Sequence, residues 1–169
     1  MKLIGIDPGL DGGVALLGGG EDGELVHTWI TPTLPHPSGK GHRREYDVPA
    51  MRRLLGATVD LAVIESAQAR PGQGVSSMFS IGKGFGLWLG LLAGLGIPYD
   101  IVHPRRWSGA MLADVAKGDT EAAAAVVATR LFPALDLRAS PRCRKLHSGM
   151  VDALLIAEWK RRQLLNTPR

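Results

Sequence analysis

The sequence predicts an α/β domain in which helices pack against a mixed β-sheet. Its first third contains short apolar runs separated by tight turns, which is typical of hairpin strands. Helix-forming segments then alternate with short apolar strands, an order that favours parallel pairing. The chain has 169 residues, no internal repeat and no composition shift, so residues 1–169 are predicted to form a single domain.

The N-terminal strands are predicted from alternating apolar runs and turns. "KLIGID" (2–7) and "GGVALL" (12–17) are joined by the turn "PGLD", and "LVHTWITP" (25–32) follows as a third strand. The segment "TPTLPHPSGKGHRR" (31–44) is rich in Pro, Gly and basic residues, and is therefore predicted to be a loop.

The middle of the chain alternates between helix and strand. "DVPAMRRLLGA" (47–57) is predicted to be a helix, with Asp47 as N-cap and Pro49 in the first turn. "LAVIES" (61–66) is a short apolar strand, and "ARPGQG" (69–74) is a loop.

A glycine-rich helix is predicted over 75–96. Its glycines at positions 82, 84, 86, 90 and 94 each cost roughly 1 kcal/mol of helix propensity relative to Ala. A close helix–helix contact, for example across a dimer, would offset that cost. The apolar stretch "GLWLGLLAGLGIPY" within and after it is expected to be too short and too Gly-broken to span a membrane.

Four further elements complete the predicted chain: strand 99–104, short helix 105–112, helix 118–132 and helix 148–165. Asp119 is the expected cap of the third of these, and Ser148 is a candidate N-cap of the last.

The charge distribution favours a polyanionic partner. The formal net charge is +4, and basic residues gather at 39–46, 103–107, 138–145 and 159–162. Each cluster alone is also typical of a solvated loop or helix end, but several in one domain favour a nucleic-acid surface. The single Cys143 excludes an internal disulfide, and no signal peptide is recognisable, so we expect a cytoplasmic protein.

Three acids stand in apolar surroundings. Asp7 ends the first strand, Glu65 ends "LAVIE", and Asp152 lies in "MVDALLIA". Buried carboxylates need a partner, and oxygen ligands without cysteine favour Mg²⁺ or Mn²⁺. Two such ions about 4 Å apart can hydrolyse a phosphodiester without a nucleophilic side chain. Each acid also has a simpler reading: Asp7 as a turn residue, Glu65 in an ion pair with Arg, and Asp152 as a helix N-terminal charge.

Five segments in order resemble RuvC-like Holliday junction resolvases, in particular the phage and bacterial branch: "GIDPGLDGGVAL", "VIESAQARPGQGVSSMFSIGKGFGLWLG", "YDIVHPRRW", "EAAAAVVATRLFP" and "HSGMVDALLIAEW". The resemblance implies an RNase H-like fold with a five-stranded mixed sheet flanked by helices. It also implies a Mg²⁺-dependent homodimer, without a nucleotide cofactor, that makes paired symmetric nicks in four-way DNA junctions. Asp7, Glu65 and Asp152 would then be its metal-binding catalytic carboxylates.

The resemblance leaves a fourth metal ligand open, because Ser148 and Gly149 stand where the family usually has an Asp or His. His147 is a candidate ligand, or a capping or loop residue. The lysine that many relatives carry near the scissile phosphate is replaced by Thr120, and Lys117 is a candidate substitute. The other candidate DNA contacts are Arg70, Gln73, Lys83, Arg105 and Arg106.

Three apolar side chains have two readings each. Met78 and Phe79 fit a wedge between bases, or core or dimer packing, which we favour. Trp107 is expected in the core rather than as a stacking platform.

Two alternative functions remain. The departures at the fourth ligand and at Thr120 suit a junction-binding protein whose active site has decayed. The turn "DPGLDGG" also resembles the phosphate-binding turn of actin-like ATPases and sugar kinases, but those proteins need two such domains, for which this chain is too short.

Overall fold

A five-stranded sheet forms the centre of the protein, with strand order β3-β2-β1-β6-β7. A computed structural model describes residues 1–20, 23–35, 44–56, 59–68, 72, 74–115 and 118–166. The strands of the sheet are β1 (Lys2–Asp7), β2 (Gly13–Gly20), β3 (Gly23–Ile30), β6 (Leu61–Glu65) and β7 (Tyr99–Val102). Strands β1, β2 and β3 pair antiparallel, whereas β6 is parallel to both β1 and β7, which confirms the predicted mixed sheet.

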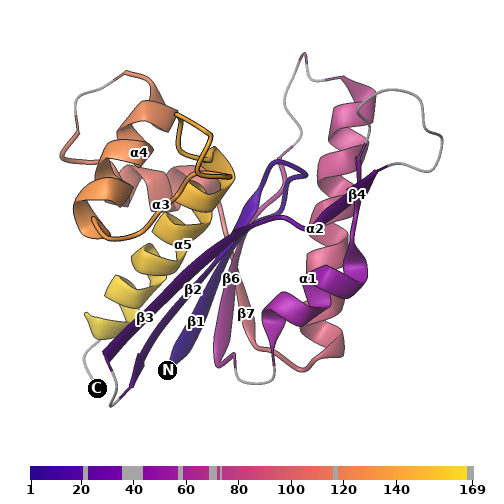
Figure 1. Ribbon diagram of the computed structural model, residues 1–169. Coiled ribbons are helices and arrows are strands. Elements are labelled where there is room, and N and C mark those ends of the chain that lie inside the picture. The colour runs from indigo at the N-terminus through magenta and orange to yellow at the C-terminus, as the bar shows by residue number, and fades with distance from the viewer. Residues whose placement is uncertain are drawn as a thin grey trace.

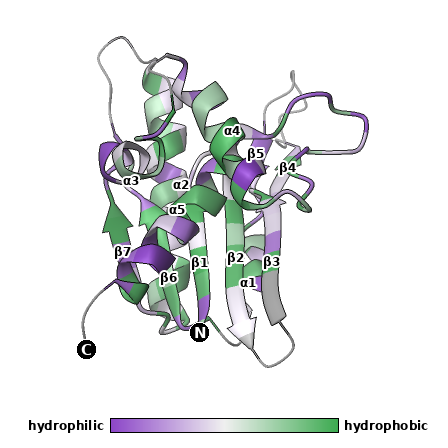
Figure 2. Ribbon diagram, turned by 90° about the vertical axis from the view of Figure 1, so that its left-hand side faces the viewer, coloured by the Kyte–Doolittle hydropathy of each residue, from purple (hydrophilic) through white to green (hydrophobic). Residues whose placement is uncertain are grey.

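Helices cover both faces of the sheet (Figure 1). The two on one face are α1 (Val48–Leu55) and α2 (Val75–Gly94), and those on the other are α3 (Pro104–Met111), α4 (Thr120–Leu131) and α5 (Ser148–Leu165). Leu3 packs in the α5 core and Ile4 in the α2 core, because successive side chains of a strand point to opposite faces. Coverage on both sides explains why β1 and β6 are hydrophobic along most of their length (Figure 2).

Two of the predicted helix caps are confirmed. Asp47 accepts a hydrogen bond from the backbone N–H of Ala50 at 3.0 Å and caps α1. Asp119 accepts one from the N–H of Glu121 at 2.9 Å and caps α4. For α5, the candidate cap Ser148 is wrong, because the helix begins at that residue, and His147 is the N-cap.

Part of the segment 31–44, which was predicted to be a loop, forms strands, while its residues 36–43 lie outside the described residues. Strand β4 (Thr33–Pro35) pairs antiparallel with β5 (Arg44–Tyr46), and the two form a separate hairpin. Tyr46 anchors β5 to the rest of the domain. Its ring is buried, and its hydroxyl donates to the carbonyl oxygen of Ser80 in α2 at 3.0 Å.

Helix α2 carries an unusual amount of uncovered apolar surface. By length and composition it could cross a membrane, the one such helix in the part of the chain that the structure describes, and only 17% of its 18-residue apolar window is buried. The apolar stretch 86–99 was expected to be too short to span a membrane. That expectation about length was wrong, because the helix starts eleven residues earlier, at Val75.

Candidate active site

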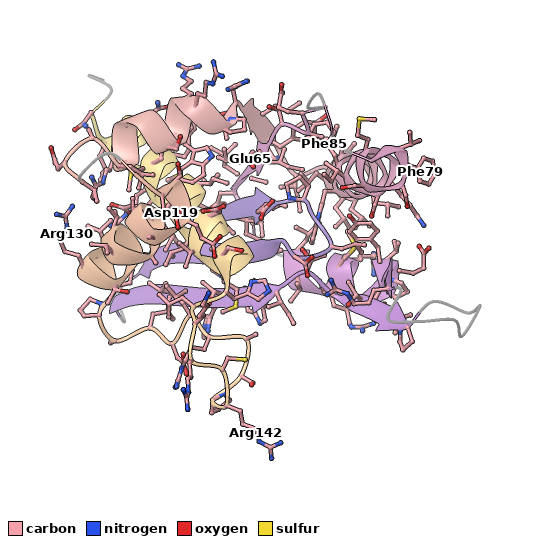
Figure 3. The ribbon with its side chains drawn as sticks, turned by 90° about the horizontal axis from the view of Figure 1, so that it is seen from above. Glu65, Phe79, Phe85, Asp119, Arg130 and Arg142 are labelled. Atoms are coloured by element: carbon pink, nitrogen blue, oxygen red, sulfur yellow. The ribbon has the colours of Figure 1, made fainter. Side chains whose placement is uncertain are left out.

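The three acids singled out in the sequence lie at one end of the sheet. Asp7 and Glu65 are the last residues of β1 and β6, two parallel neighbours in which Ile6 pairs with Ile64. Asp152 is the fifth residue of α5, the helix packed on these strands. Figure 3 looks onto this end, with Glu65 between Asp119 of α4 and Phe79 of α2.

Glycines allow α5 to approach the sheet closely enough to bring Asp152 to the site. A Cβ on Gly5 would lie 2.1 Å from the carbonyl oxygen of Ala153, and one on Gly149 would lie 2.4 Å from that of Asp11. Gly149 also bridges to Gly12 in the turn after β1. The start of α5 therefore rests directly on the backbone of the turn that follows Asp7.

Burial and mutual repulsion perturb two of the carboxylates. Burial, with the nearby charge of Glu65, raises the pKa of Asp7 from 3.8 to about 7, although a hydrogen bond from the Gly9 backbone opposes the rise. Burial, with the charges of Asp7, Glu65 and Glu121, raises the pKa of Asp152 to about 8. Burial and the neighbouring acids thus make it unfavourable for all three carboxylates to be ionised together.

Glu65 is held by a residue whose role was not predicted. The indole Nε1–H of Trp107 in α3 donates a 2.7 Å hydrogen bond to Oε1 of Glu65. Trp107 is only 3% exposed, so its predicted place in the core is confirmed. The sequence contains one hint of its second role: "HPRRW" follows the strand next to the one that Glu65 ends.

The donor set of the site fits a hard divalent cation. Asp7, Glu65 and Asp152 supply carboxylate oxygens, the ligands that Mg²⁺ and Mn²⁺ prefer. A cation would also relieve the repulsion that raises the pKa values of both aspartates. Within the described residues, no group of three or more His, Cys, Asp or Glu side chains is arranged as a metal site. The carboxylates therefore share one end of the sheet and one electrostatic environment but do not converge on a single point.

The structure shows His147 in its capping role. Its Nδ1 accepts a hydrogen bond from the backbone N–H of Met150 at 3.3 Å, and burial lowers its pKa. A neutral imidazole has only one unprotonated nitrogen, so the cap and a metal bond compete for it. The capping alternative is confirmed, and metal binding by His147 stays a prediction that the cap opposes.

The predicted DNA contacts have different settings. Lys83 forms an ion pair with Glu45 of β5. Arg105 and Arg106 are exposed in the first turn of α3, beside Pro104, which lines a 260 Å³ cavity with Asp7 and Glu65. Arg70, Gln73 and Lys117 lie outside the described residues.

The first turns of α2 expose apolar side chains. Phe79 is 73% exposed, so packing in the core of this chain is wrong for it, whereas dimer packing and the wedge between bases stay predictions; Met78 is half-buried. The helix packs on the sheet through its second half, around Trp88 and Leu92, which leaves the first turns uncovered.

Solved structures share this architecture over nearly the whole chain. RuvC of Thermus thermophilus in complex with a Holliday junction substrate matches with a TM-score of 0.62 and 19% identity, over 94% of this chain and 92% of that one. This protein has the RuvC fold. A second structure of Thermus thermophilus RuvC matches with a TM-score of 0.60 and 20% identity, over 96% of both chains.

A eukaryotic protein shares the RuvC fold with this chain as well. The yeast mitochondrial Holliday junction resolvase Ydc2 matches with a TM-score of 0.59 and 12% identity, over 97% of this chain and 80% of that one. The sequence matches no protein-family model, and a search of curated proteins finds no match to it. The likeness to RuvC thus lies in the fold. Asp7, Glu65 and Asp152 lie at one end of the sheet of this fold.

Proposed function

We propose that this protein is a Holliday junction resolvase, a crossover junction endodeoxyribonuclease of the cytoplasm. The observation that carries the proposal is the gathering of Asp7, Glu65 and Asp152 at one sheet end. The fold around them is shared with proteins described as RuvC bound to a Holliday junction substrate and as a Holliday junction resolvase. The sequence resemblance, found independently, points to the same class.

In this proposal the three carboxylates hold Mg²⁺ or Mn²⁺ as two ions per site. Bound there, the metal would supply a nucleophilic water at neutral pH and stabilise charge on the leaving oxygen. Trp107 keeps one oxygen of Glu65 oriented through its 2.7 Å hydrogen bond, so this carboxylate is partly preorganised. Asp7 is kept in place by the Gly9 backbone, and Asp152 by the contact of α5 with the strands.

The test is cleavage of a synthetic four-way junction with nick positions mapped, in Mg²⁺ and in EDTA. We expect paired symmetric nicks in Mg²⁺, none in EDTA, and none with Asp7→Asn in either. Asp60→Asn is the matched control, because Asp60 precedes β6 and so lies at the other end of the strand that Glu65 ends. Absence of nicking by the unmodified protein in both Mg²⁺ and Mn²⁺ would refute the proposal.

The alternative is a junction-binding protein without catalysis. The use of His147 as a helix cap favours it, because this removes the nearest candidate for a fourth ligand. Binding of the four-way junction by both the unmodified protein and Asp7→Asn, with nicking by neither, would establish this alternative.

We infer further that the protein acts as a homodimer through α2, without a membrane. Gly82, Gly86, Gly90 and Gly94 recur every four residues, and a Cβ on any of them would meet nothing within 4 Å. No contact inside the described chain therefore accounts for their cost in helix propensity, whereas a second copy packed along this stripe would, and it would cover the exposed apolar surface.

Light scattering tests the dimer. We expect a dimer for the unmodified protein and a monomer for Gly90→Glu, with Gly109→Glu on α3 as the control, because a Cβ there also meets open space. A dimer that survives Gly90→Glu, or a protein that partitions into vesicles, would overturn the α2 interface.

A further inference from the structure

A groove of about 880 Å³ extends from Asp7, at the end of the sheet that carries the three carboxylates. Its walls are the turn between β1 and β2, the β4–β5 hairpin and the first half of α2. Of the residues that the structure describes, Arg44 and Lys83 are the basic side chains that line it.

Each of these cations is paired with an acid of the same chain that also lines the groove. Nη2 of Arg44 lies 2.5 Å from Oδ1 of Asp11, and Nζ of Lys83 donates to Oε2 of Glu45. The side chains of Arg44 and Asp11 are 42% and 81% exposed, and those of Lys83 and Glu45 are 39% and 35% exposed. Ion pairs as exposed as these are weak, so a competing anion can replace the carboxylates at little cost.

The groove keeps its shape without these ion pairs. The Tyr46 hydroxyl of the hairpin donates a hydrogen bond to the carbonyl oxygen of Ser80 in α2. It also lies 3.4 Å from the carbonyl oxygen of Pro8, in the turn after β1. Gly84 allows this approach, since a Cβ there would lie 2.2 Å from the Tyr46 hydroxyl and 2.4 Å from the Pro8 oxygen. The three walls therefore meet at Tyr46, and exchange of the ion pairs does not require them to move.

We propose that one strand of the DNA substrate lies in this groove and that Arg44 and Lys83 bind its phosphates by exchanging partners. In the free protein Asp11 pairs with Arg44, and Glu45 pairs with Lys83. In the complex, backbone phosphates of the DNA replace these two carboxylates. This inference rests on the proposed function, because it assigns the path by which a strand reaches Asp7.

The chemistry of the groove suits such an exchange. Phosphates of a DNA strand release condensed counterions when a cation neutralises them, a gain that a lone carboxylate cannot match, and arginine can bind a phosphate through two hydrogen bonds. Among the described lining residues, the acids Asp7, Asp11 and Glu45 accompany the two cations before the exchange. A strand that follows the groove can satisfy both cations at once, which favours DNA of the right shape.

The experiment measures binding of a fluorescent four-way junction by anisotropy in EDTA, which prevents cleavage, over a range of salt concentrations. Asp11→Asn and Glu45→Gln remove the competing acids and are expected to tighten binding about two- to fivefold. Arg44→Gln and Lys83→Gln are expected to weaken it and to reduce the slope of log K against log salt by about 1 each.

Matched controls separate this exchange from a change in overall charge. Asp136→Asn removes an acid from a comparable exposed ion pair, with Arg138, outside the groove. Arg130→Gln removes a cation on α4, which lies across Glu65 from Phe79 (Figure 3). Both controls are expected to change affinity less than the groove variants. Arg44→Lys keeps the positive charge and should retain the slope of log K against log salt. If Arg44→Lys binds the junction normally, loss of binding in Arg44→Gln is due to the missing charge rather than to misfolding.

Two results would overturn the exchange: equal tightening by Asp136→Asn and Asp11→Asn, or an unchanged salt slope in Arg44→Gln. Either can occur while the unmodified protein still nicks junctions in Mg²⁺, in which case the groove proposal fails alone. If the protein binds a four-way junction no better than duplex DNA and nicks neither, the proposed function fails, and the variants still report whether the groove binds DNA.

Discussion

Replacing Asp7 with Asn should stabilise the metal-free protein while removing its proposed activity. Burial and the neighbouring Glu65 make the ionised form of Asp7 unfavourable in the folded state, which raises its pKa from 3.8 to about 7. Asparagine has nearly the same shape and can still accept the hydrogen bond from the Gly9 backbone. The substitution therefore removes a buried charge without leaving a cavity.

The size of the effect follows from the pKa shift, at about 1.4 kcal/mol per pKa unit. Asp7 binds its proton more tightly when folded, so its contribution to stability is full below pH 4 and is lost as the pH rises through about 7. At pH 8 the loss is about 4 kcal/mol, at pH 5 about 2 kcal/mol, and at pH 4 it is small. For a chain of this size, 4 kcal/mol corresponds to a rise in Tm of about 10 °C.

The assay is thermal unfolding of both proteins in EDTA at pH 8, 5 and 4, repeated in Mg²⁺ at pH 8. We expect Asp7→Asn to be more stable at pH 8, with a difference that shrinks as the pH falls. Magnesium should reduce the difference, because only the unmodified protein retains the complete carboxylate set. If Asp7→Asn is less stable than the unmodified protein in EDTA by the same amount at every pH, the reasoning is refuted. Ionisation of Asp7 would then not be what destabilises the unmodified protein.

Three further substitutions test the surroundings of the site. Trp107→Phe keeps a buried aromatic ring but removes the hydrogen bond to Glu65. We expect the nicking rate to fall about tenfold and to need more Mg²⁺, measured as rate against metal concentration. An unchanged metal requirement would contradict this role of Trp107. Gly149→Ala forces a Cβ into the turn after β1 and should cost about 3 kcal/mol of unfolding free energy, whereas Gly109→Ala, in open space on a helix, should not destabilise; equal effects in denaturant titrations would count against the close contact. His147→Ala should lose about 1 kcal/mol of stability and His147→Asn should restore it, with nicking retained in His147→Asn if capping is the residue's only role.

Much of the fold could be predicted because its signals are local. The apolar runs of β1 and β6 and the caps at Asp47 and Asp119 depend on residues close together in sequence, and the structure confirms them. The β4–β5 hairpin could not be predicted in this way. It depends on contacts between Tyr46 and both Ser80 and Pro8, more than 30 residues away in each direction, and no turn or strand pattern encodes such contacts.

The candidate site likewise has features that depend on local sequence and features that depend on long-range contacts. Its three carboxylates could be identified from the sequence, because an acid at the end of an apolar strand, or within an apolar helix, stands out in the order of residues alone. Their surroundings could be read only from the folded chain: the hydrogen bond from Trp107 to Glu65, the capping role of His147, and the groove beside Asp7 whose cations pair with its own acids. These depend on where separate elements meet in space, and a one-dimensional pattern of burial does not carry that information.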